Sequence, residues 1–283
     1  MLGIVHLLQD SALGRWSYWE WRPRQLAAVA ELLWQSRGTV THPRKRILPN
    51  GKLELLVNLG PPIRLAEGAG ADRFVGGTLS GLQCGPLVIE MVGGHTHVLG
   101  VRLTPAGAYA LLGRPMGELG GLTVGLDDLV GRAAAELAER CDAAPSVEER
   151  FRIAARWITR QILGSPRVEP AIAYAAAQLE RSAGAVPIAR LRDELGLSKT
   201  RLAARFRDQI GVTPKRYARI LRFHRLVPRL HAREGDLAAL ALAAGYYDQA
   251  HMTAEFRALS GLTPGEFLAS ARYAQTIAVA EPG

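Results

Sequence analysis

Residues 243–264 read AAGYYDQAHMTAEFRALSGLTP, and residues 196–214 carry the same pattern fifty positions earlier as GLSKTRLAARFRDQIGVTP. Each copy has a capping residue, apolar anchors four and eight positions later, a helix-stopping glycine and a Thr-Pro pair that starts another helix. A short apolar helix ending in glycine precedes each copy, at 188–195 and 237–244. The paired positions are Ser198 and Asp248, Leu202 and Met252, Phe206 and Phe256, Gly211 and Gly261, Thr213 and Thr263, and Pro214 and Pro264. This order predicts two helix-turn-helix units in tandem, which suit the reading of two stretches of one DNA duplex.

The positive charge of the chain is concentrated near the first copy. The 283 residues carry a formal charge of +9. Residues 198–233 hold eleven basic residues and one acid, Asp208, a net charge of +10, so the remainder of the chain sums to −1. A solvated helix face normally mixes both signs. The concentration of one sign therefore indicates an anionic partner, double-stranded DNA.

The cysteine content and the hydropathy of the sequence indicate the cellular compartment of the protein. Cys84 and Cys141 are the two cysteines, and their spacing is not that of metal ligands, which favours free thiols in a reducing compartment. Residues 1–10 lack the features of a signal peptide, and no apolar run reaches the ~20 residues that span a bilayer. We expect a cytoplasmic protein with no membrane contact and no bound cofactor.

The first 125 residues predict a strand-rich structure. Apolar, partly β-branched runs at 53–59, 86–91 and 97–103 are bounded by glycine or proline. Helical periodicity is expected at 25–35 (QLAAVAELLWQ) and in a short helix from Thr104 to Leu112. These features suit a small open barrel decorated by helices.

Two amphipathic helices in a hairpin follow between residues 126 and 163. Their apolar stripes either pack on their own domain or supply a dimer seam. Gly164-Ser165-Pro166 gives the best domain boundary, between an effector-binding or dimerisation domain at 1–165 and a DNA-binding domain at 166–283. The expected fold class is α+β: a barrel-like sensor domain with a helical hairpin, then an all-α domain whose two motifs are joined by a linker helix. We expect Pro228 to kink that linker or to end it near Val227.

The carboxyl-terminal ~100 residues resemble the DNA-binding domain of the AraC/XylS family of bacterial transcription regulators. The resemblance is carried by 197–214 and above all by 243–264, where Gly-Tyr is followed by a polar run, Phe-Arg and Gly-Leu-Thr-Pro. Residues 46–51, 53–60 and 100–107 are similar to one branch of the sensor domains attached to this unit. The resemblance implies DNA binding and transcription regulation. The family often has arginine two residues before each recognition-helix phenylalanine, where this chain has Ala204 and Ala254.

Candidate DNA-binding residues follow from side-chain chemistry. Arginine can bond O6 and N7 of guanine together, glutamine suits adenine, and a threonine methyl suits thymine. Basic residues farther along each helix more often hold phosphates and set register. We expect base reading by Lys199, Thr200, Arg201, Gln249 and His251, and phosphate contacts by Arg205, Arg207, Lys215, Arg216 and Arg257.

Candidate ligand-binding residues of the first domain are aromatic or histidine. In an extended strand, Trp19 and Trp21 share one face while Trp16 and Tyr18 share the other. These residues either line an apolar pocket or pack a small core. His95 and His97 also share a face, but two histidines without a third ligand rarely hold a metal, so no metal site is predicted.

The leading interpretation is a transcription regulator that responds to a small-molecule effector, with a homodimer and a contact to RNA polymerase as candidate associations. The main alternative is a constitutive DNA-binding protein whose first domain serves only dimerisation or partner binding. A more remote alternative is a DNA-tethered repair enzyme that uses Cys84. The sequence shows no catalytic constellation, so we do not expect an enzyme.

Overall fold

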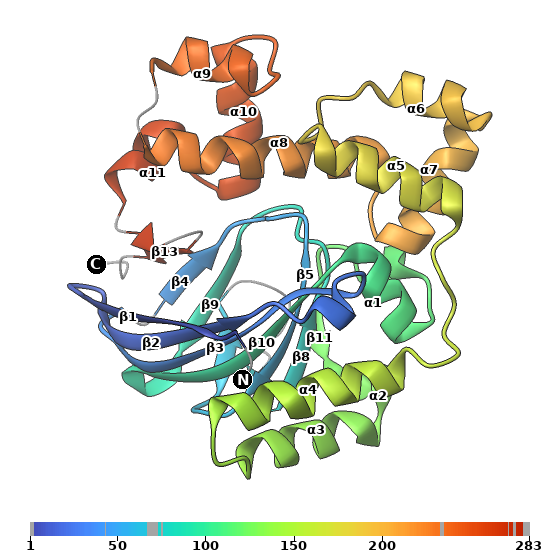
Figure 1. Ribbon diagram of the computed structural model, residues 1–283. Coiled ribbons are helices and arrows are strands. Elements are labelled where there is room, and N and C mark those ends of the chain that lie inside the picture. The colour runs from blue at the N-terminus through green and yellow to red at the C-terminus, as the bar shows by residue number, and fades with distance from the viewer. Residues whose placement is uncertain are drawn as a thin grey trace.

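The computed structural model describes residues 3–42, 44–66, 73–74, 76–232, 235–270, 272–273 and 276–279 (Figure 1). Strands fill the amino-terminal part of these residues, and helices fill most of the carboxyl-terminal part. The predicted α+β class, with a strand-rich first region and a helical second region, is confirmed.

Two antiparallel sheets form the strand-rich region. Among the described residues, the first sheet has seven strands in the order β1-β2-β3-β10-β5-β8-β11, and the second has six in the order β12-β13-β4-β9-β6-β7. The first sheet comprises β1 Val5–Ser11, β2 Gly14–Trp21, β3 Ala30–Val40, β10 His95–Leu103, β5 Leu53–Asn58, β8 Gly77–Ser80 and β11 Thr123–Gly125. The second comprises β12 Arg272–Tyr273, β13 Thr276–Val279, β4 Arg44–Ile47, β9 Leu87–Met91, β6 Ile63–Leu65 and β7 Arg73–Phe74.

The two faces of the first sheet differ in burial. In β5, Leu53, Leu55 and Val57 are at most 1% exposed and join the main hydrophobic cluster, whereas the alternating residues Glu54 and Leu56 are only half-buried. Because side chains alternate along a strand, the apolar set faces the helices that cover the sheet. We call the opposite, half-open side the inner face.

The predicted helix at 25–35 is wrong. A single 3₁₀ turn occupies Arg24–Leu26, and β3 begins at Ala30. β3 pairs with β2 on one side and with β10 on the other, so it lies inside the sheet. Alanine, leucine and glutamine give this stretch a helical preference of its own, but pairing with two neighbouring strands overrides that weak local preference.

Helices α1 Pro105–Leu112, α2 Leu126–Val130, α3 Arg132–Asp142 and α4 Val147–Gln161 cover the outer face of the sheet (Figure 1). Thr104 caps α1 by accepting a hydrogen bond from Gly107 N, as its Thr-Pro start predicts. The predicted helical hairpin at residues 126–163 is also present, although Gly131, at φ 58° and ψ −139°, divides its first helix into α2 and α3. Leu137, Phe151 and Ile158 are fully buried in the main cluster, so both stripes pack within the chain.

The carboxyl-terminal helices follow the repeated pattern. They are α5 Pro170–Arg181, α6 Ile188–Leu195, α7 Lys199–Ile210, α8 Pro214–His231, α9 Leu237–Ala243, α10 Gln249–Ser260 and α11 Pro264–Ala269. Ser198 caps α7 and Asp248 caps α10, while Gly211 and Gly261 end these helices in the left-handed region. We refer to residues 170–213 as the first head and to residues 237–270 as the second head.

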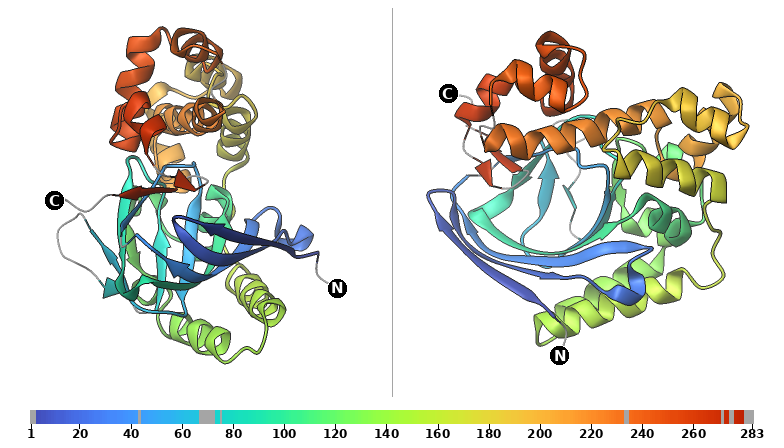
Figure 2. Two further views of the ribbon diagram at one scale, coloured as in Figure 1. Left: turned by 90° about the vertical axis from the view of Figure 1, so that its left-hand side faces the viewer. Right: turned by 45° about the horizontal axis from the view of Figure 1, so that its top comes forward.

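Of the two outcomes expected at Pro228, a kink in the linker helix or its end near Val227, the end is wrong. α8 continues through Pro228 to His231, giving 18 residues and a length of ~27 Å at 1.5 Å per residue. Proline removes only one backbone hydrogen bond, and Val227 and Leu230 on either side of it are buried in the core of the second head. Packing therefore holds the last turn in helical form. Figure 2 shows α8 running across the top of the sheets with one head at each end.

The heads differ in how they join the first domain. The core of the first head is continuous with that of the sheets, since Phe206 and Ile210 belong to one cluster with Leu82 and Met116. The second head has its own cluster, which takes up Leu48 from the strand-rich region. Beyond Ala269 the chain departs from an all-helical arrangement, because β13 pairs with β4. The boundary at 165/166 stays a prediction.

Candidate DNA-binding interface

The ten candidate DNA-binding residues all lie on the surface of α7, α8 or α10. Lys199, Thr200 and Arg201 form the exposed first turn of α7, directly after the Ser198 cap. The side-chain oxygen of Ser198 accepts a hydrogen bond from Arg201 N at 3.2 Å. The first turn is thereby fixed in orientation, with its backbone N–H groups and basic side chains at one end of the helix.

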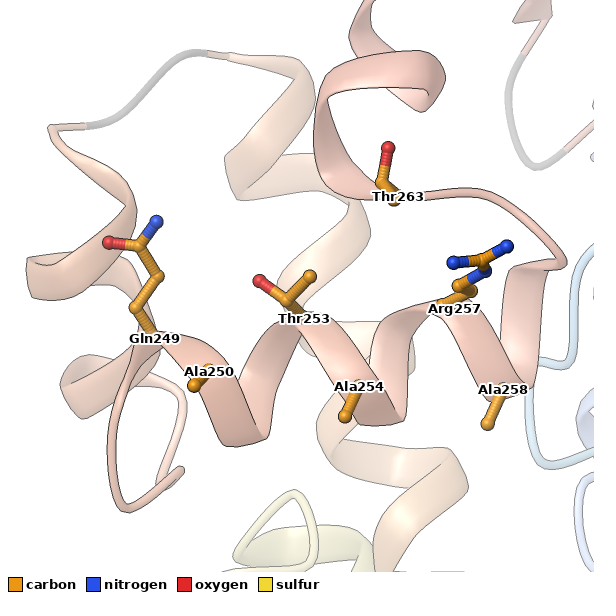
Figure 3. Close-up of a pocket in the computed structure, with 7 residues that line it drawn as sticks. All are labelled: Gln249, Ala250, Thr253, Ala254, Arg257, Ala258 and Thr263. Carbon is orange, nitrogen blue, oxygen red and sulfur yellow. The ribbon is translucent and has the colours of Figure 1, made fainter.

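A shallow groove of about 880 Å³ follows one face of α10 (Figure 3). Gln249, Thr253 and Arg257 are spaced by four residues along its edge, with small side chains beside them. Residues at this spacing share a helix face. The groove is lined by Gln249, Ala250, Thr253, Ala254, Arg257, Ala258 and Thr263. This face combines hydrogen-bonding groups with a floor of alanines that allows close approach to the helix backbone.

His251 belongs to a different side of α10. Its Nε2 lies 3.6 Å from the Glu255 carboxylate, and its Nδ1 accepts a hydrogen bond from Tyr247 N at 3.4 Å. The imidazole is thus engaged within the protein, although it is exposed. Thr253 faces the groove and was missed by the sequence reasoning; its position four residues after Gln249 was the available signal.

Two of the predicted phosphate-binding arginines also contact other parts of the protein, Arg205 through its guanidinium and Arg207 through its aliphatic stem. Arg205 forms an ion pair with Glu169 at 2.8 Å, with both side chains about 44% exposed. Arg207 packs on Gly117, where an added Cβ would come within 3.1 Å of Arg207 Cγ. Lys215 and Arg257 lie at exposed positions of α8 and α10.

Cys84 lies beside the basic start of α8. It is half-buried and packs against the cores of both heads. Burial raises the pKa of its thiol, and the nearby Arg216 and Arg219 offset this only in part. A thiol with a raised pKa is mostly protonated at neutral pH and is a poor nucleophile. The arrangement therefore gives no support to catalysis by Cys84.

The strand-rich region contacts the carboxyl-terminal ends of both α7 and α10. A Cβ at Gly211 would lie 3.3 Å from Met116 O, and one at Gly120 would lie 2.6 Å from Gly211 O. At the other head, a Cβ at Gly261 would lie 3.4 Å from Pro86 Cγ. The two helix-stopping glycines thus lie against the strand-rich region, which restrains where each recognition helix ends.

The aromatic segment of β2 is divided between the two faces of the sheet. Trp21 stacks on Phe151 of α4 with ring centroids 6.2 Å apart, and Trp19 stacks on His6 at 4.8 Å. On the other face, Tyr18 stacks on Trp34 at 5.9 Å. Trp16 is 7% exposed. The four predicted ligand-binding aromatics therefore do not come together, and Trp19 and Trp21 serve packing.

A polar cluster occupies the inner face beneath α8. Glu54 accepts a hydrogen bond from Trp34 Nε1 at 3.1 Å and another from Arg102 Nε at 2.7 Å. The Trp34 indole covers Gly100, where a Cβ would lie 2.1 Å from the ring. Burial, and then the charge of Arg102, lower the pKa of His224 on α8. Trp34 was missed because it lay within the predicted helix.

The two predicted histidines lie on β10 but gather no further ligands. His95 is exposed and His97 is half-buried, and burial lowers the pKa of His97. Within the residues that the structure describes, no group of three metal-ligating side chains occurs. Likewise, no helix of the described part is long and apolar enough to cross a bilayer.

Comparison with known proteins bears on both halves of the chain. A family model described as a helix-turn-helix domain matches residues 191–270. Residues 191–270 therefore form a helix-turn-helix domain. A second model, described as a domain of unknown function, matches residues 22–125. No curated protein matches the sequence.

Solved structures similar to this chain include ToxT, a domain of AraT and CuxR. ToxT from Vibrio cholerae is 11% identical, with 83% of this chain and 97% of that chain covered and a TM-score of 0.46. The C-terminal domain of AraT, a response regulator from Geobacillus stearothermophilus, is 16% identical over 37% of this chain and 88% of its own, with a TM-score of 0.35. The AraC-like transcriptional activator CuxR is 17% identical over 80% and 86%, with a TM-score of 0.29.

Proposed function

We propose that this protein is a sequence-specific DNA-binding transcription regulator that reads two successive major-groove faces with α7 and α10. The observation that carries the proposal is the exposed face of α10, where Gln249, Thr253 and Arg257 line one groove. The equivalent positions of α7, fifty residues earlier, are Lys199, Ala203 and Arg207, so this face of α7 has a basic residue at each end and a small residue between them. A net charge of +10 over 198–233 supplies the attraction to phosphate.

The inner face of the first sheet supports a role in binding a small-molecule effector. Trp34 and Arg102 both donate hydrogen bonds to Glu54, and all three residues are only half-buried, whereas the outer face of the same strands is closed. An aromatic surface beside fixed charged groups is typical of ligand sites. Because His224 of the linker helix lies near Arg102, a ligand bound there would contact an element that joins the two heads.

The main alternative is a constitutive DNA-binding protein whose first domain binds only a second copy or a partner. The hydrophobic core that the first head shares with the sheets is equally consistent with this alternative. Thermal unfolding with a panel of metabolites separates the two, because only a regulator with an effector gains stability from one of them. If a metabolite stabilises the protein, Trp34→Phe, which removes the indole donor to Glu54, is expected to weaken the stabilisation by that metabolite. Lys215→Ala is expected to leave it unchanged.

DNA binding is tested by fluorescence anisotropy on two duplexes, one of random sequence and one selected from a random pool by the full-length protein. Arg201→Ala is expected to cost about 1–3 kcal/mol on the selected duplex and little on the random one. Lys215→Ala is expected to weaken both duplexes alike and to reduce the salt slope by about 0.9. Equal losses on both duplexes for Arg201→Ala would show that Arg201 holds phosphate rather than a base.

A further inference from the structure

The middle of α8 carries one side chain that contacts both heads. Arg222 Nη1 donates to Gly184 O of the first head at 3.4 Å, and Arg222 Nη2 donates to Glu255 Oε2 of the second head at 3.5 Å. The same guanidinium carbon lies 5.6 Å from the centre of the Tyr246 ring, also in the second head. A planar group with several donors in fixed directions is suited to such a bridge.

Glu255 is the partner that holds this bridge in the second head. Arg219 Nε lies 2.6 Å from Glu255 Oε1, so two arginines of α8 converge on one carboxylate of α10. The side chain of Glu255 is 12% exposed and that of Arg222 is 19% exposed. Charges with so little access to water interact more strongly than a surface pair, and removal of Glu255 would leave both arginines without their carboxylate partner.

The backbone of both heads approaches α8 at adjacent turns. Gly184, at φ +76°, lies so close to α8 that a Cβ would come within 2.1 Å of Ala218 O. Gly245, at φ +84°, lies in the turn between α9 and α10, and a Cβ there would be 3.6 Å from Arg222 Cδ. Residues 218 and 222 are one helical turn apart. The turn that precedes α6 and the turn that precedes α10 therefore meet α8 side by side.

We propose that Arg222 and Glu255 are positioning residues that fix the angle and spacing between the two recognition helices. Without the bridge, the second head would be held only by α8, its own packing and its contacts with the strand-rich region at Leu48 and Pro86. With the bridge, Arg222 of α8 holds α10 in a fixed position relative to the first head. The consequence for DNA reading, which rests on the proposed function, is a fixed spacing between the two stretches of duplex that one chain recognises.

The first experiment measures the spacing of the heads in the full-length protein without DNA. Spin labels are placed at Ala189→Cys in α6 and Leu242→Cys in α9, both exposed, in a Cys84→Ser background; Cys141 is fully buried. Electron–electron double resonance is expected to give one narrow distance distribution. Arg222→Lys keeps the charge but lacks the fork that reaches Gly184 O and Glu255 together, so it is expected to broaden the distribution. Glu255→Gln is expected to broaden it further.

Glu194→Gln is the matched control. It removes one acid that is ion-paired to Arg190 at 2.7 Å on exposed α6, and so changes the net charge by the same amount as Glu255→Gln. It is expected to leave the distribution narrow. Should Glu255→Gln fail to fold by circular dichroism, Arg222→Lys carries the test alone. Unchanged distributions in folded Arg222→Lys would overturn the proposal and assign head spacing to the contacts with the strand-rich region.

The second experiment inserts one to five base pairs between the two contacted stretches of a duplex selected by the wild-type protein. Each inserted pair moves the second site by ~3.4 Å and rotates it by ~34°. We expect wild-type affinity to fall steeply with insertion, and that of Arg222→Lys to start lower and fall less. An equal loss of affinity per inserted base pair in the wild type and in Arg222→Lys contradicts the proposal. Absence of DNA binding by the wild type instead refutes the proposed function, while the distance measurement still decides the role of the bridge.

Discussion

Replacing Lys45 by methionine should stabilise the protein at neutral pH. Lys45 lies in β4 opposite Ile89 of β9, and burial alone lowers the pKa of its ammonium from 10.5 to about 8. A pKa decrease of that size corresponds to a cost of about 3 kcal/mol in the free energy of unfolding, at ~1.4 kcal/mol per pKa unit. This value is an upper bound, because the side chain retains some access to water. Lys45→Met removes the charge while keeping an unbranched chain of similar length.

The pH dependence gives the sign of this effect. Below pH 8 the lysine is protonated in both the folded and the unfolded state, so the full cost of the buried charge is present. Between pH 8 and 10.5 the folded state releases its proton while the unfolded state keeps it, and the stability of the wild type rises. Above pH 10.5 the cost is absent. The advantage of Lys45→Met is therefore expected to be largest at pH 6–8 and to decline by up to about 3 kcal/mol towards pH 10.5.

Urea unfolding followed by tryptophan fluorescence at pH 7, 8, 9 and 10 measures this difference in the free energy of unfolding. Lys215→Met, at an exposed position of α8, is the control and should show no such decline relative to wild type. A stability difference between Lys45→Met and wild type that stays constant over this range, or a variant that is less stable at pH 7, would refute the assignment of an uncompensated buried charge.

Three further substitutions test the interface. Gln249→Ala should cost about 1–3 kcal/mol of base discrimination on the selected duplex, measured by competition, whereas His251→Ala, which lies off the groove, should cost less. Gly120→Val should separate α7 from the strand-rich region, since a Cβ would lie 2.6 Å from Gly211 O; faster amide exchange in the last turn of α7 is the expected result, and unchanged exchange would contradict it. Glu169→Gln should release Arg205 and strengthen binding to random duplex DNA, and unaltered affinity would show that this ion pair does not compete with phosphate.

Much of the helical part could be predicted from local patterns. The capping residues Ser198 and Asp248 and the glycines Gly211 and Gly261 act through neighbouring backbone groups, so their effect is visible in the sequence. The length of α8 could not be obtained in this way. Pro228 is unfavourable in isolation, and the burial of Val227 and Leu230 against other helices decides that the helix continues.

Among the candidate sites, the groove residues of α10 could be predicted in part from the sequence, whereas the polar cluster on the inner face could not. Gln249 and Arg257 line one groove, and helical spacing could have added Thr253. Trp34 and Glu54, in contrast, lie 20 residues apart and meet only because β3 and β5 flank β10. The aromatic residues of β2 lie on opposite sides of the sheet, as the alternation of side chains along a strand predicts.

The sequence by itself determined the two helix-turn-helix units, their caps and stops and the segment that carries the positive charge, because these depend on residues a few positions apart. Only the tertiary structure decided which arginines remain available to DNA, which one bridges the heads, and where the ends of the recognition helices are held. Those properties arise from ion pairs and close backbone contacts between residues 30 to 175 positions apart, such as Arg222 with Glu255 and Gly261 with Pro86. A sequence pattern of a few neighbouring residues cannot show contacts between residues so far apart in the chain.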